Sequence, residues 1–303
     1  MREHRPSFTA AFVATCRGLG PLLPERLRLV DDPLGARFAG GPLGDLAAAL
    51  RDAGPVARGA AAAGLAPLVP WVLYMQVRTR AIDDALVEAV EAGCRQVVIL
   101  GAGFDTRASR MRAVLRDAAV YEVDHPATQR RKRAVIDAAG APSLARYLAW
   151  DFERDPMSEL PARLAAMGHE LAAPTFTIWE GVTMYLSAEA LDATARAVAG
   201  YSAPGSRLAF NYVQRALVDA PGPLTALVSR FVKGVGEPFR SGFDPETLSE
   251  WLEPRGFALV SDDDFAELAE RMLPPPWSRL ARVGRRFAVA ERSALAERAA
   301  PAA

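Results

Sequence analysis

Two short segments of the chain combine residue types that suit the binding of an adenosine-type ligand. Residues 97–107 read VVILGAGFDTR, an apolar run followed by a glycine turn, and residues 120–124 read VYEVD and end on a carboxylate. A run of apolar residues that do not alternate with polar ones is typical of a strand that is covered on both faces. Gly101 and Gly103 carry no Cβ, so the backbone can turn sharply and approach a ligand closely. The carboxylate of Asp124 can accept hydrogen bonds from both hydroxyls of a ribose, and the two segments therefore predict an adenosine-type ligand.

The residues after the glycines indicate which adenosine ligand this is. A dinucleotide fingerprint needs a small third residue where the pyrophosphate meets the helix, but this sequence has Thr106 there, preceded by Asp105. A carboxylate beside a pyrophosphate is unfavourable because like charges repel each other. S-adenosylmethionine has no phosphate and carries an ammonium and a sulfonium group, with which Asp105 is compatible. The loop therefore favours S-adenosylmethionine over NAD or FAD.

Three blocks of the sequence resemble the signature blocks of the leucine carboxyl methyltransferase family. They are GAGFDTR at residues 101–107, YEVDHP at residues 121–126 and EGVTMYL at residues 180–186. Residues 77–84 are similar to the family's helix before the first strand, and Asp32 with the following proline is similar to its N-terminal cap. The resemblance covers most of the chain. It implies a Rossmann-like class I methyltransferase fold, and the bacterial branch of the family contains proposed O-methyltransferases linked to polyketide and other secondary metabolism.

The resemblance also implies roles for individual residues. Asp151 would accept a hydrogen bond from the adenine amino group, and Phe152 would supply an apolar wall. Glu180 would pair with the ammonium of the cofactor, while Arg78 and Arg17 would hold its carboxylate through the planar guanidinium fork. The complete set of expected cofactor-binding residues is Arg17, Arg78, Gly101, Ala102, Gly103, Asp105, Asp124, Asp151, Phe152 and Glu180.

Each of these roles has a structural alternative. Asp124 is also a good N-cap for a helix that begins after it, and Asp151 is as well suited to a turn. Glu180 could form a structural hydrogen bond where its strand ends. Arg17 and Arg78 could be solvated or cap the core, because arginine is abundant in this chain.

Two residues of the matching blocks, His125 and Tyr185, are candidates for catalysis. His125 adjoins the expected ribose-binding residue, and packing or hydrogen bonding in the turn is its favoured interpretation. A carboxylate acceptor has a pKa of about 4 and needs no base, whereas a phenol has a pKa of about 10 and needs one. The scarcity of acid–base groups therefore favours carboxyl methylation, although a base from another segment stays open.

Composition excludes several other classes of protein. The 303 residues include 36 Lys plus Arg and 36 Asp plus Glu, so the balance gives no electrostatic case for nucleic acid or an anionic membrane. No apolar run reaches the length of a membrane span, and no metal-ligand spacing occurs. Two cysteines, Cys16 and Cys94, form no disulfide framework, and the chain opens without a secretion signal, so we expect a reducing cytoplasm. The oligomeric state stays open.

The pattern of elements that must position these residues changes near residue 93. Residues 1–92 are expected to form a helical cap, with helical periodicity over 45–53 and 80–92. Residues 93–303 alternate strands with helices, which predicts a doubly covered, mostly parallel sheet. Its first strands are expected near 96–100, 119–123, 146–150, 175–179 and 206–212, and a helix capped by Ser187 near 187–200.

The remaining elements complete the predicted methyltransferase domain. Residues 213–240 contain several prolines and glycines and are interpreted as a substrate lid after the fifth strand. Asp244 is expected to cap a helix that ends near Glu253, and two late strands are expected near 257–260 and 287–289. With them the sheet has the seven strands of a class I methyltransferase. Four aromatic residues could line an acceptor cleft: Phe210, Tyr212, Phe231 and Phe239.

The sequence thus predicts an S-adenosylmethionine-dependent O-methyltransferase that acts on a carboxylate or hydroxyl of a small metabolite, such as a polyketide or another natural product. Two alternatives stay open. One is a protein that binds the cofactor without methyl transfer, as a cyclase or a regulatory protein. The other is a nicotinamide-dependent oxidoreductase, which Asp105 disfavours.

Overall fold

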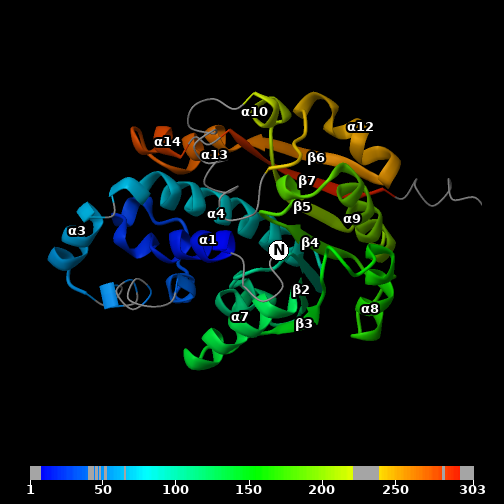
Figure 1. Cartoon of the computed structure of the whole chain (residues 1–303), viewed down its shortest axis with the longest axis horizontal. Coiled ribbons are helices and arrows are strands. Elements are labelled where there is room, and N and C mark those ends of the chain that lie inside the picture. Colours follow the sequence, from blue (N-terminus) through cyan, green and yellow to red (C-terminus); the bar gives the residue numbers. More distant parts are fainter. Residues whose placement is uncertain are drawn as a thin grey trace, which may run out of the picture.

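The architecture is a seven-stranded sheet with helices on both faces (Figure 1). The computed structural model describes residues 8–39, 53–64, 66–220, 239–281 and 284–293, together with residues 44, 47, 49 and 50. The strand order is β3-β2-β1-β4-β5-β7-β6, and only β7 runs antiparallel to its neighbours. This arrangement confirms the expected fold class. The strands are β1 (Gln96–Leu100), β2 (Ala119–Asp124), β3 (Ala145–Ala149), β4 (Thr175–Trp179), β5 (Arg207–Val213), β6 (Phe257–Asp264) and β7 (Arg285–Arg292).

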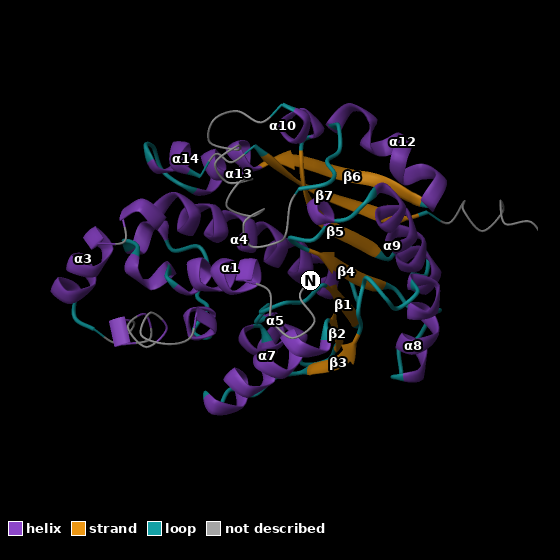
Figure 2. Cartoon of the chain, in the orientation of Figure 1, coloured by secondary structure: helices purple, strands orange, loops and turns teal. Residues whose placement is uncertain are grey.

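The central strands lie where the apolar runs predict them. Every residue of β1 and of β4 is buried, because helices cover both faces of the sheet (Figure 2). On one face α4 (Val69–Glu91) packs against the sheet, and on the other lie α8 (Leu160–Ala166) and α9 (Ala188–Tyr201).

The two late strands are longer than predicted. The second half of β6 reads SDDD, and aspartate is rare in strands. In the structure Arg286 of β7 lies opposite, and its Nε is 3.0 Å from Oδ2 of Asp262. Pairing of opposite charges across two strands therefore extends the ladder where the hydrophobic pattern had already ended.

The N-terminal segment is helical around α1 (Phe8–Gly18), α3 (Pro55–Gly64) and α4. Helix α4 begins at Val69, eleven residues before the expected start at residue 80, since its first half is apolar on most sides and shows little helical periodicity. Leu73 and Val77 of α4 share one apolar cluster with Val97 and Ile99 of β1. The division into a cap and a methyltransferase domain at residue 93 stays a prediction, and most of residues 45–53 lies outside the described residues.

The N-terminal ends of three helices test the predicted N-cap residues. One of these predictions is confirmed and two are corrected. The hydroxyl of Ser187 accepts a hydrogen bond from Ala190 N, as expected for α9. Helix α7 (Pro126–Ala138) is capped by His125, whose Nδ1 accepts from Ala127 N at 3.2 Å, so the alternative role of Asp124 as N-cap is wrong. Asp244 makes no capping bond, because a 3₁₀ turn at Pro245–Thr247 separates it from α12 (Leu248–Leu252).

The insertion after β5 is described at its two ends. It begins with α10 (Arg215–Asp219), and residues 221–238, the centre of the predicted lid, lie outside the described residues. The chain returns at residue 239, and Phe243 forms a bridge with Gln214. Among the helices that the structure describes, none is long and apolar enough to cross a membrane.

Candidate active site

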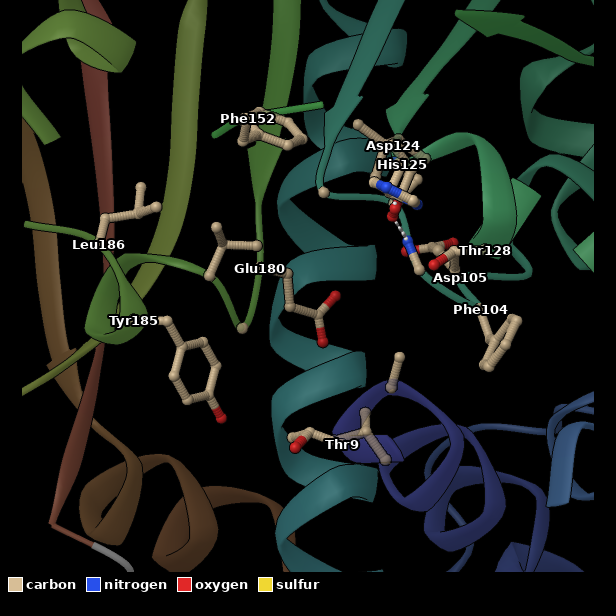
Figure 3. Close-up of a pocket in the computed structure, with 18 of the residues that line it drawn as sticks. Thr9, Phe104, Asp105, Asp124, His125, Thr128, Phe152, Glu180, Tyr185 and Leu186 are labelled. Carbon is tan, nitrogen blue, oxygen red and sulfur yellow. Dashed lines mark hydrogen bonds between the residues drawn. The ribbon is translucent and has the colours of Figure 1, made fainter. Parts of the chain in front are cut away.

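A cavity of about 480 Å³ opens at the carboxyl edge of the sheet (Figure 3). The carboxyl ends of adjacent parallel strands meet at this edge, which is where open α/β sheets bind ligands. The cavity brings together every site residue that the sequence predicts. They are Arg17, Arg78, Gly101, Ala102, Gly103, Asp105, Asp124, His125, Asp151, Phe152, Glu180 and Tyr185.

The glycine loop is joined directly to the carboxylate at the end of β2. Gly101 and Gly103 have φ angles of 61° and 48°, in the left-handed region that glycine adopts without strain. The Gly103 N–H donates to Oδ2 of Asp124, and the N–H of His125 donates to Oδ1 at 2.5 Å. Burial raises the pKa of Asp124, although these two backbone donors oppose the shift. Each carboxylate oxygen keeps a second lone pair that can accept a ligand hydroxyl.

Glu180 lies at the end of β4 between two arginines. Its Oε1 is 2.7 Å from Nε of Arg78, and its Oε2 is 2.7 Å from Nη1 of Arg107. Burial alone would raise the pKa of Glu180, but the charges of Arg78 and Arg107 outweigh it and hold the pKa below its usual value. The turn after β4 is stabilised by another contact, in which Gly181 N donates to Asn211 Oδ1 at 2.6 Å. Glu180 is therefore an ionised member of a buried charge network.

Arg107 is the residue that the sequence reasoning missed as an organiser of the site. Its side chain is 1% exposed, and besides Glu180 it contacts Asp83 through Nε at 2.7 Å and Asp105 through Nη1. Its backbone N–H also donates to Asp105 at 2.7 Å. The position is visible at the end of the GAGFDTR block, close to Asp105, but its other two partners, Asp83 and Glu180, lie on distant segments.

The pairing with Arg107 changes the interpretation of Asp105. The charge of Arg107 opposes the desolvation of Asp105 and holds the pKa of that carboxyl below its usual range. In the sequence alone, Asp105 is an unpaired charge that repels a pyrophosphate. Because the charge is compensated, that repulsion is weaker than expected, and Asp105 alone does not exclude a dinucleotide.

The two predicted arginines are buried and paired. Arg17 is 4% exposed, with Nε 2.5 Å from Asp32 Oδ2 and Nη2 2.6 Å from the carbonyl oxygen of Phe104. Arg78 is 3% exposed and lies over the ring of Tyr74. The alternative that these arginines are solvated is therefore wrong. Both contribute to the cavity wall while they bind a carboxylate of the protein.

Asp151 lies both in a turn and at the cavity, which are the two places that the sequence predicts for it. Its Oδ1 accepts from Glu153 N at 3.0 Å in the turn after β3, and its side chain lines the cavity beside Phe152. Its Oδ2 lies 3.7 Å from Nε2 of His125. His125 thus lies at the end of the cavity formed by β2 and β3, and its Nδ1 is occupied as the cap of α7.

Tyr185 projects its hydroxyl into the cavity from the 3₁₀ turn η6 (Thr183–Tyr185) (Figure 3). Its ring packs against Phe239, with the ring centroids 5.8 Å apart. Phe210, Tyr212 and Phe239 do not line the cavity as expected. Phe210 and Tyr212 point into the apolar core against Phe243. The fourth expected aromatic residue, Phe231, lies outside the described residues.

Further lining residues were not predicted from the sequence. They come from α1, from α7, from the turns after β1 and β4, and from the end of the β5 insertion, and include Thr9, Val13, Phe104, Thr128, Val182, Leu186 and Arg240. Phe104, Val182 and Leu186 lie within two of the signature blocks, whereas no local motif marks the other four residues, whose common feature is proximity in the fold. Within the described part of the chain, no three His, Cys, Asp or Glu side chains gather closely enough to hold a metal ion.

Two solved structures share this fold. One, a proposed methyltransferase from Thermobifida fusca, is 20% identical, with a TM-score of 0.57 over 91% of this chain and 98% of that one. Another, a DUF574 family protein from Streptomyces avermitilis, is 19% identical, with a TM-score of 0.55 over 80% of this chain and 92% of that one. At these identities the likeness shows the fold alone.

Sequence relatives give a closer relationship. A protein from Mycolicibacterium smegmatis, named as a proposed S-adenosyl-L-methionine-dependent methyltransferase, is 38% identical over 208 residues. The match covers 67% of this chain and 64% of the relative, so the chain spans less than two thirds of that protein. A Streptomyces coelicolor protein with the same type of name is 38% identical over 145 residues, which cover 47% of this chain and 50% of that protein. The model of the leucine carboxyl methyltransferase family matches residues 10–199, and the chain belongs to this family.

Proposed function

We propose that this protein is an S-adenosylmethionine-dependent methyltransferase that transfers the methyl group to an oxygen atom of a small metabolite. The observation that carries the proposal is the contact between the glycine loop and Asp124, because it fixes a buried carboxylate beside a close-approach loop at the end of β2. This arrangement suits the ribose of an adenosine-type cofactor. The family membership and the names of the relatives support the same cofactor.

The charges along the cavity fit the rest of this cofactor. Asp151 and Phe152 lie beyond Asp124 along the sheet edge and suit the adenine. Glu180 offers an ionised carboxylate for the ammonium group, and Arg78 offers terminal N–H groups for the carboxylate, since its Nε is already bound to Glu180. The cofactor would supply an activated methyl group on its sulfonium. The protein then has to align the acceptor oxygen with that methyl group and exclude water.

The positions of the two catalytic candidates favour an acceptor that needs no base. His125 uses Nδ1 as a helix cap, and its Nε2 lies next to Asp151 at the adenosine end of the cavity. Tyr185 is better placed to orient an acceptor through its hydroxyl. A carboxylate is already ionised at neutral pH, and we therefore favour it over a phenol as the reacting group. A polyketide-like natural product and a cytoplasmic location belong to the same proposal; the two cysteines, buried and free of disulfides, fit a reducing compartment.

Calorimetric titration with S-adenosylmethionine and S-adenosylhomocysteine tests the proposal. We expect wild-type dissociation constants in the micromolar range, which correspond to about 8 kcal/mol. Asp124→Ala should weaken binding by about 10- to 100-fold because it removes both acceptors for the ribose. The exposed acid Asp117, near the opposite end of β2, provides the control Asp117→Ala, which should bind normally.

The outcomes separate the candidate functions. A folded wild-type protein that binds neither ligand overturns the proposal, and NAD binding in the same experiment would favour the oxidoreductase. Binding that is equally strong in Asp124→Ala would remove Asp124 from the site. If the cofactor binds and acidic acceptors are present, formation of S-adenosylhomocysteine distinguishes methyl transfer from a protein that only binds the cofactor.

A further inference from the structure

The two ends of the cavity differ in charge. The end formed by the turns after β2 and β3 carries the carboxylates of Asp124 and Asp151. The opposite end lies beyond β4, next to β5, and there Arg240 is one of the residues that line the cavity. The adenosine part of the proposed cofactor occupies the acidic end, so the basic end is available to the acceptor.

Arg240 is held in place by the turn that also carries Tyr185. Its backbone N–H donates to the carbonyl oxygen of Met184 at 2.8 Å. The hydroxyl of the next residue, Ser241, donates to the carbonyl oxygen of Thr183 at 2.8 Å, and Ser241 is 8% exposed. Arg240 and Tyr185 therefore lie on one backbone unit, and their relative position is fixed by hydrogen bonds on both sides.

Arg240 differs from the other arginines of the cavity in its charge balance. Arg17 is paired with Asp32, and Arg78 with Glu180. For Arg240, no carboxylate partner occurs among the residues that the structure describes, and the side chain is exposed. An uncompensated guanidinium at a cavity wall is suited to an anionic ligand, which it can bind through two parallel hydrogen bonds.

Aromatic rings lie next to this guanidinium. Tyr185 lines the cavity and packs against Phe239, the residue before Arg240. The guanidinium of Arg285, at the start of β7, lies 5.7 Å from the ring centroid of Phe239 and supports it from outside the cavity wall. A flat apolar body can therefore pack on Tyr185 while an anionic group reaches Arg240.

We propose that Arg240 is the acceptor-binding residue for an organic anion with a flat apolar body, and that the anionic group it binds is not the oxygen that takes the methyl group. The inference rests on the proposed methyltransferase function and specifies its acceptor. A guanidinium bonded to the attacking oxygen would stabilise its negative charge and so reduce its basicity and its reactivity. An acceptor of this kind carries two polar groups, one anion that Arg240 recognises and, because the described cavity residues favour an acceptor that needs no base, a separate carboxylate that takes the methyl group.

The test uses pairs of probes that differ only in charge. The protein, loaded with S-adenosylhomocysteine, is dialysed against four carboxylates and their neutral carboxamides: benzoate, 2-naphthoate, 6-hydroxy-2-naphthoate and octanoate. We expect the wild-type protein to bind at least one aromatic carboxylate about tenfold or more tightly than its amide. Arg240→Gln should abolish this preference, and Arg240→Lys should keep part of it because it preserves the charge without the fork.

A matched control comes from the other end of the same insertion. Arg215 is 54% exposed, pairs with Asp244 at 3.5 Å and does not line the cavity, so Arg215→Gln should keep the full preference. Equal binding or no binding across all four pairs in the wild-type protein overturns the inference, and so does a preference that survives in Arg240→Gln. Because binding of S-adenosylhomocysteine is measured first for each variant, failure of the cofactor proposal is recognised separately from failure of this one.

Discussion

Lys132 and Glu122 form a fully buried ion pair below the candidate cofactor site. Lys132 Nζ lies 2.5 Å from Glu122 Oε2, and each side chain is 1% exposed. Glu122 precedes Asp124 by two residues on β2, so both side chains are on the same face of the strand. The sequence has lysine only at positions 132 and 233, and the buried cation is thus a lysine in a chain whose basic residues are otherwise arginine.

Removal of one partner of this pair should destabilise the protein strongly. Lys132→Met leaves Glu122 buried without its cation, and we expect the free energy of unfolding to fall by about 3–5 kcal/mol. The additional change Glu122→Gln should recover most of this loss, because the double variant buries no charge at that place. Urea unfolding measures both effects. As a control, Arg80→Met breaks the exposed pair of Arg80 with Asp84 and should cost about 0.5 kcal/mol. If Lys132→Met were as stable as the wild-type protein, the pair would have no energetic importance.

The same pair predicts a dependence of stability on pH. Burial raises the pKa of Glu122 from its ordinary value of 4.5 to about 7, although Lys132 opposes the shift. A raised pKa means that the folded state holds the proton more tightly. The contribution of Glu122 to stability is therefore complete below the unfolded pKa of 4.5 and is lost as the pH rises through about 7.

Relative to the Lys132→Met, Glu122→Gln double variant, the wild-type protein should lose stability on the order of 1–3 kcal/mol between about pH 5 and about pH 8. Urea unfolding of both proteins at several pH values gives this difference. Parallel curves, or a wild-type protein that gains relative stability with rising pH, would contradict the prediction.

The conformation of the glycine loop can be tested at Gly101. Gly101→Ala would place an alanine at φ 61° with its Cβ 2.5 Å from Cγ2 of Val182, and we expect a loss of about 2–4 kcal/mol. In the Gly101→Ala background, Val182→Ala should remove the steric part of the loss and leave the backbone part. A double-mutant cycle by urea unfolding measures this coupling. Gly205 has φ 82° in open space, so Gly205→Ala should show the backbone part alone. Zero coupling between positions 101 and 182 would refute the close approach.

The role of His125 can be separated into capping and catalysis. His125→Ala should cost about 1 kcal/mol of stability because α7 loses its cap, whereas His125→Asn should cost little since asparagine is a good N-cap. We also expect His125→Asn to retain most of the methyl-transfer rate once an acceptor is identified. Thermal unfolding and a steady-state assay measure the two properties. A large fall of kcat in His125→Asn at unchanged stability would show instead that the imidazole is a base.

The sequence by itself determined where the central strands lie and which predicted residues line the cavity. Strands β1 and β4 have the predicted bounds, because continuous burial on both faces leaves a local signal in the form of an uninterrupted apolar run. The predicted cofactor and catalytic residues all line one cavity. Those that lie at or after the ends of β1, β2, β3 and β4 meet there because the ends of parallel strands lie at one edge of the sheet, whereas Arg17 and Arg78 reach it from α1 and α4. The motifs therefore sufficed to name twelve of the residues that line the cavity, but not Arg240 or the organising role of Arg107.

Only the tertiary structure decided how those residues are paired. Arg78 and Glu180 are 102 positions apart, and Arg107 and Glu180 are 73 positions apart, so no local spacing could reveal that Glu180 is held between two guanidinium groups. The cap of α7 is likewise His125, because the carboxylate of Asp124 is already bound to the glycine loop. A hydrophobic pattern is a property of neighbouring residues and can be recognised in the sequence. The partner of a buried charge depends instead on which distant segments the fold brings within hydrogen-bonding distance.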